Sequence, residues 1–97
     1  MSDIKASLLM TAGGNVSHQD AVWLGRSRVK GIQFKASVAG TITLRDGGAA
    51  GPIICAFAIP AGADTIPIPG DGLLFRTDVF LVVTTATLDG LTVFYTA

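Results

Sequence analysis

Three Asp-Gly pairs constrain this sequence more than any other feature. They are Asp46-Gly47, Asp71-Gly72 and Asp89-Gly90, and each lies beside a short apolar run. Asp-Gly in that position is a strong signal of a hairpin turn, because both residues tolerate the positive backbone angles of tight turns. All seven acidic residues are Asp, and Asp favours turns and caps, whereas Glu favours helices. The chain is therefore predicted to be all-β.

The clearest strand is predicted over residues 29–38. Apolar side chains at positions 32, 34, 36 and 38 alternate with polar ones, which is the period of a strand with one buried face. Gly31 lies where the pattern changes parity and predicts a β-bulge. Ala39-Gly40 then predicts a tight turn into a second strand over residues 41–45, so that the two strands form a hairpin.

The remaining apolar runs predict further short strands bounded by turn residues. Ile66-Pro67-Ile68-Pro69 indicates an edge segment or a crossing between sheets, because neither proline can donate a ladder hydrogen bond. In total we expect about eight short antiparallel strands, spaced roughly ten residues apart, in a single small β-sandwich of jelly-roll-like form. Residues 1–20 are expected to be an N-terminal strand or arm, and residues 21–97 the sandwich domain.

Composition favours a protein that binds other protein chains. Charged residues are 14% of the sequence and hydrophobic residues 49%, whereas an ordinary domain carries about 25% charged residues. Protein interfaces are depleted of charge, so we expect oligomerisation or docking on a larger assembly. Net charge is zero, which argues against nucleic acid or an anionic membrane as the main partner. No apolar stretch has the length of a membrane-spanning helix, and no signal peptide is evident.

No catalytic or metal-binding constellation stands out, and we expect neither enzymatic activity nor a cofactor. Ser17, His18 and Asp20 are neighbours in the sequence, but adjacency is not the geometry of a catalytic triad, and His18 is expected to be a solvated surface residue. One cysteine and one histidine cannot complete a zinc site. Cys55 lies in an apolar run, which predicts a buried, unreactive thiol.

Four motifs follow one another at residues 25–32, 40–47, 66–75 and 91–95, within about residues 22–97. Their order resembles that of small structural proteins of tailed bacteriophages. It implies a β-sandwich virion component of the capsid decoration or cement type, assembled in the host cytoplasm and stabilising the finished capsid. It also implies a homotrimer whose other partner is the major capsid protein or a tail protein.

Two alternatives stay open: a tail- or fibre-associated structural module, and a carbohydrate-binding domain for host attachment. Sugar binding would use Trp23 and Tyr95, the two aromatic residues with polar tips. For an interface we expect Trp and Arg side chains, which dominate binding hot spots, and residues from strands that are apolar on both faces. The candidate interface residues are Trp23, Arg26, Arg28, Ile54, Val79, Leu81 and Tyr95.

Overall fold

The computed structural model describes residues 4–19 and 22–96, and within these ranges it is all-β with no helix. The prediction of an all-β fold is therefore confirmed. The strands are β1 (Lys5–Ala6), β2 (Gly14–Asn15), β3 (Ser27–Val38), β4 (Gly40–Asp46), β5 (Ile53–Ile59), β6 (Gly62–Pro67), β7 (Leu73–Phe75), β8 (Val79–Thr84) and β9 (Thr87–Thr96).

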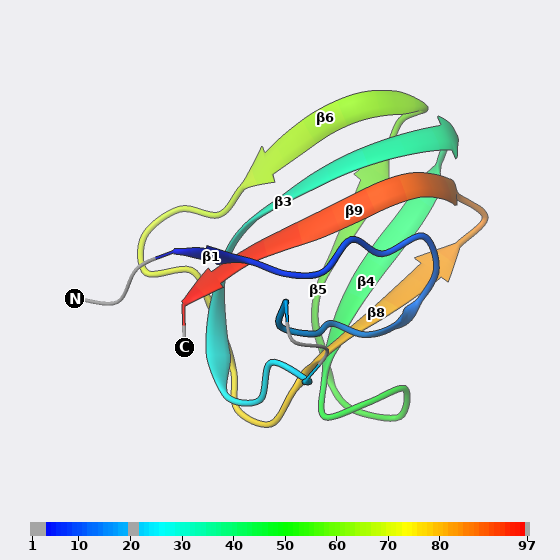
Figure 1. Ribbon diagram of the computed structural model, residues 1–97. Helices are drawn as coiled ribbons and strands as arrows, with labels where there is room; N and C mark the ends of the chain where they lie inside the picture. Colours follow the sequence, from blue (N-terminus) through cyan, green and yellow to red (C-terminus); the bar gives the residue numbers. More distant parts are fainter. Residues whose placement is uncertain (1–3, 20–21, 97) are drawn as a thin grey trace.

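The strands form two antiparallel sheets that face each other (Figure 1). The first sheet has the order β1-β9-β3-β6, and β7 pairs with the N-terminal part of β3. The second sheet has the order β2-β8-β4-β5. β6 is an edge strand and ends at Pro67, which confirms the edge position that the Ile-Pro repeat predicted.

The two sheets are one antiparallel sheet folded in half. β3 continues into β4, β5 into β6 and β8 into β9, with only residues 39, 60–61 and 85–86 between them. All three crossings lie at the same end of the molecule, which we call the corner (Figure 1). Pairing continues on both sides of it, because Val38 pairs with Thr87 and Thr41 pairs with Thr84.

The predicted hairpin over residues 29–45 is therefore wrong. β3 and β4 belong to different sheets and do not pair with each other. At Ala39 the chain changes sheets, and Gly40 already belongs to β4. Gly40 packs against the neighbouring crossing so closely that a β-carbon there would lie 2.2 Å from the Ala86 nitrogen and 2.4 Å from the Thr84 oxygen.

The three Asp-Gly pairs have three different roles. Asp46-Gly47 opens the loop of the β4–β5 hairpin, and Asp71-Gly72 forms the turn between β6 and β7, as predicted. Asp89-Gly90 lies inside β9, at a register shift against β3, so the turn predicted there is wrong. The chain changes sheets earlier, between β8 and β9, where Thr85 has a left-handed φ of 68°. Asp-Gly can occur in a β-bulge as well as in a turn, because in a bulge one residue is left out of the regular pairing between the strands.

The core lies between the sheets and takes the inward side chains of both. On β3 the predicted alternation is confirmed for Ile32, Phe34 and Ala36, and a register shift at Gly31 confirms the bulge. The buried apolar side chains are Val16, Leu24, Val29, Ile32, Phe34, Ala36, Ile42, Leu44, Ile59, Phe75, Val79, Leu81, Leu88, Leu91, Val93 and Tyr95.

The N-terminal segment packs as part of this domain. β1 pairs with β9 and β2 with β8, and Val16 is fully buried. The Ser7 side chain is buried too, and its Oγ accepts a hydrogen bond from the Val93 backbone N–H at 2.9 Å. Within residues 4–19 the structure has the two short strands β1 and β2, and Val16 contributes to the common core.

Candidate functional site

The structure separates the seven predicted interface residues into accessible and buried ones. Arg26 and Arg28 are exposed, Ile54 is half-buried, and the Trp23 side chain is 57% exposed. Val79, Leu81 and Tyr95 are buried in the core. Their side chains offer no surface to another chain, so these three interface predictions are wrong.

Val79 and Leu81 are buried because they lie on the inward face of β8. Leu81 pairs with the buried Leu44 and therefore points inward, as does Val79 two residues before it. Phe80 and Val82 occupy the outward positions and are half-buried. Because both faces of this strand are apolar, the sequence pattern could not indicate which parity faces the core.

Tyr95 has a different role, as the anchor of the N-terminal segment. It points inward from β9, and its hydroxyl forms a hydrogen bond with His18 Nδ1 at 2.5 Å, with the two rings edge to face. Gln19 Nε2 donates to the carbonyl oxygens of Ala6 and Ser7 at 3.1 and 2.9 Å. His18 is thus half-buried and bonded, contrary to the solvated position expected of it. Tyr95 is 1% exposed, so it cannot stack on a sugar, and of the two aromatic residues expected for sugar binding only Trp23 is accessible.

Arg26 and Arg28 flank a shallow hollow at the N-terminal end of β3. Its lining is completed by Ser27, Leu74 and Thr96. Register explains the grouping, since Arg28 pairs with Leu74 of β7 on one side and with Thr96 of β9 on the other. Two cations therefore border one small surface, which suits contact with a carboxylate-bearing protein surface.

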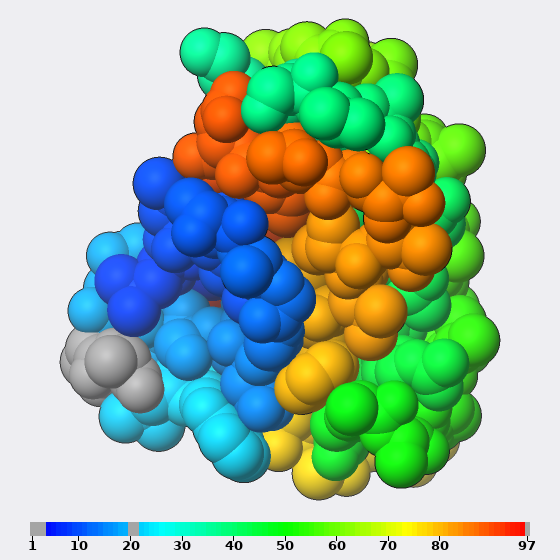
Figure 2. Space-filling model, turned by 90° about the vertical axis from the view of Figure 1, so that its right-hand side faces the viewer, coloured from blue at the N-terminus to red at the C-terminus, as the bar shows by residue number. Residues whose placement is uncertain are grey.

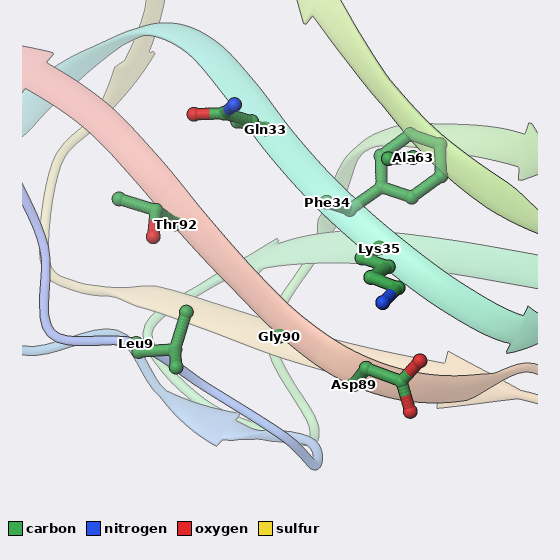
Figure 3. Close-up of a pocket in the computed structure, with 8 residues that line it drawn as sticks. All are labelled: Leu9, Gln33, Phe34, Lys35, Ala63, Asp89, Gly90 and Thr92. Atoms are coloured by element: carbon green, nitrogen blue, oxygen red, sulfur yellow. The ribbon is translucent and has the colours of Figure 1, made fainter.

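A second hollow lies on the outer face of the first sheet and was missed from the sequence (Figure 3). It is lined by outward residues of β3 and β9 with Leu9 beside them, among them Gln33, Lys35, Asp89 and Thr92. Asp89 Oδ1 accepts a hydrogen bond from Ser37 Oγ at 3.2 Å. The hollow has a volume of about 270 Å³, which is slightly below the range of typical enclosed ligand pockets. The outward parity of β3 was the sequence signal that could have located it.

Exposed apolar side chains are concentrated in the N-terminal quarter of the chain. Ile4, Leu9, Val22 and Trp23 are each more than half exposed. Figure 2 shows this quarter, coloured blue to cyan, over the left part of one face of the molecule. Within the described ranges, the other large exposed hydrophobic residues are Val38 and Ile53. Large apolar side chains left exposed in one part of a chain are candidates for a protein-binding surface. We call the four N-terminal side chains the N-terminal apolar surface.

The described residues contain no group of three or more side chains able to hold a metal ion. Asp20, named above with Ser17 and His18, lies outside the described residues. Cys55 is half-buried on β5, and burial raises the pKa of its thiol to about 11 despite a backbone hydrogen bond at Leu44 that lowers it. No helix in the described ranges is long and apolar enough to cross a membrane.

The comparisons with known proteins add no relative. A scan against protein-family models, a search of curated proteins and a search of solved structures each found no match. Any function must therefore be argued from the surfaces described above.

Proposed function

We propose that this protein is a structural protein of a tailed-bacteriophage virion, of the capsid decoration or cement type. The observation that carries the proposal is the N-terminal apolar surface, in which Ile4, Leu9, Val22 and Trp23 are each more than half exposed. Burying such side chains against a partner is favourable by about 25 cal/mol per Å² of apolar area. The sequence resemblance supports the virion as the place where that partner is met.

Stabilisation would come from mass action. A module that binds the assembled shell, and not its separated subunits, stabilises the shell by RT ln(1 + [L]/Kd) at every occupied site. The exposed Arg26 and Arg28 lie close in sequence to Trp23, and Trp and Arg are the residue types that contribute most to interface energy. The proposal needs no catalytic group and no cofactor.

The first test is the number of copies per virion, measured by quantitative mass spectrometry against the major capsid protein. A ratio of the same order as that of the capsid protein supports a decoration role. A ratio below about a tenth of it, the scale set by the few subunits of a tail structure, moves the protein to the tail or fibre. Absence from purified particles would overturn the virion proposal.

The second test is binding of purified variants to particles that lack the protein. Trp23→Ala is expected to weaken binding about tenfold or more, as truncation of an aromatic hot spot does. Val38→Ala is the matched control, because Val38 is also exposed and apolar but lies at the corner. Deleting the N-terminal segment is not a clean test, since Ser7 and Val16 belong to the core. Equal loss for both substitutions would contradict the assignment of this surface.

A further inference from the structure

The folded sheet leaves one long edge strand without protection. Exposed edges invite pairing with another chain, and natural proteins block them with short strands, proline or charge. Among the described strands, β1 and β2 are edges of two residues each. β6 ends in Pro67, and its Asp64 Oδ1 occupies the Thr65 N–H at 2.7 Å. β5 is an edge of seven residues that contains no proline and no charged residue, and Pro52 and Pro60 lie just outside its two ends.

β5 is apolar and uncharged along its whole length. Cys55, Phe57 and Ile59 pair with inward or corner positions of β4, so they face the core side, while Ala56 and Ala58 face outward and are exposed. The outward neighbours on β4 are Thr41 and Thr43, which are also uncharged. A register shift lies near Ile54, at the start of the strand. The regular part of the edge is therefore residues 55–59.

We propose that β5 pairs antiparallel with β5 of a second copy of this chain, about a two-fold axis through Phe57. Cys55 then meets the second copy's Ile59, and Ala56 meets the second copy's Ala58. Because the axis passes through a residue, positions equally far before and after Phe57 are opposite each other and lie on the same side of the sheet. Each core-side residue therefore faces a core-side residue, and each outward alanine faces an outward alanine. The two second sheets become one continuous sheet across the axis.

The self-complementary pattern of this edge favours a second copy over an unrelated strand. The pairing brings no charged side chain of β5 opposite another, so it carries no like-charge cost. A closed trimer built by strand pairing would need two different free edges on each chain, and the other described edges are short or blocked. The geometry therefore points to a dimer, in contrast to the trimer that the phage resemblance implies. This inference goes beyond the proposed function and does not depend on what particle the protein binds.

The first measurement is the mass in solution by analytical ultracentrifugation at several concentrations. We expect the wild-type chain to form a dimer. Ala56→Lys alters two symmetry-related pairs at the seam, and it should raise the dimer dissociation constant about tenfold or more. Ala63→Lys is the matched control: Ala63 is an exposed alanine on β6, and its replacement should leave the mass unchanged. Circular dichroism checks that each variant is folded.

Disulfide trapping tests the register. In a Cys55→Ala background, Ala56→Cys and Ala58→Cys chains are oxidised separately and as an equimolar mixture. Position 56 lies directly opposite position 58 of the second copy, whereas identical positions lie on a diagonal about 7–8 Å apart, beyond the reach of a disulfide. The mixture should therefore cross-link several-fold faster than either chain alone. A monomeric or trimeric wild type, an unchanged mass for Ala56→Lys, or equal cross-linking in all three samples would overturn the proposal.

Discussion

Replacing Gly40 by alanine tests the corner directly. Gly40 begins β4 immediately after the crossing from the first sheet. An added β-carbon would lie 2.2 Å from the Ala86 nitrogen, 2.4 Å from the Thr84 oxygen and 2.8 Å from the Ala86 α-carbon. All three atoms belong to backbone, so no flexible side chain can move aside. Two crossings would have to separate by about 1 Å to restore ordinary contact distances, which places the cost at the upper end of overpacking, about 3 kcal/mol.

The assay is thermal and urea unfolding followed by far-ultraviolet circular dichroism. A loss of about 3 kcal/mol corresponds to a fall in Tm of roughly 12–24 °C for a domain of this size. Gly48→Ala is the control, because Gly48 has a φ of 129° but no atom within 4 Å of an added β-carbon. It should show only the cost of backbone strain, about 1–2 kcal/mol. In an ordinary β3–β4 hairpin, Gly40 would lie in an open turn and accept alanine. A change below about 0.5 kcal/mol, the range of neutral surface substitutions, would refute the corner.

Three further predictions follow from individual contacts. Ser7→Ala removes the acceptor of the buried Val93 N–H and should cost about 1–3 kcal/mol in urea unfolding, whereas Ser37→Ala, at an exposed serine, should stay within about 0.5 kcal/mol. For Asp46, burial alone would raise the carboxyl pKa, but backbone hydrogen bonds from Arg76, Thr77 and Asp78 and the Arg76 charge outweigh it and lower the pKa below 3.8. The stabilising contribution of the Asp46 carboxylate is therefore complete above pH 3.8 and disappears as the pH falls through the lower pKa of the folded state. The urea midpoints of wild type and Asp46→Asn should differ at neutral pH and converge in acid. A difference in midpoint that does not depend on pH would contradict this. Because the pKa of Cys55 is about 11, its thiol should react slowly with a disulfide reagent at neutral pH in the native protein and rapidly in urea, and equal rates would show that the side chain is accessible.

The corner also relates the two edge strands β5 and β6 to each other. Three connections, β3 to β4, β5 to β6 and β8 to β9, cross between the sheets at one end. The order β9-β3-β6 in the first sheet therefore corresponds to the order β8-β4-β5 in the second. The edge of one sheet is continuous with the edge of the other through β5 and β6. Protection of β6 by Asp64 and Pro67 therefore leaves β5 as the accessible half of that edge. A partner that pairs with β5 would extend a sheet that already spans the molecule.

Local residue patterns were enough to predict the all-β class and several elements. The alternation in β3 reports the buried face because side chains in a strand change sides at every residue. The bulge at Gly31, the edge position of Pro67 and the loop after Asp46 follow from backbone geometry that glycine, proline and aspartate impose where they stand. These features depend on a residue and its immediate neighbours, so no tertiary information was needed.

Tertiary structure decided everything that depends on residues far apart in the sequence. Ala39-Gly40 is compatible with a hairpin and with a corner, and only the pairing of β3 with β9 and of β4 with β8 selects the corner. On β8 both parities are apolar, so the facing sheet determines that Val79 and Leu81 are buried. His18 meets Tyr95 across 77 residues of chain. The physical reason is the same in each case: short-range preferences allow two outcomes of similar local energy, and burial of the common core distinguishes them.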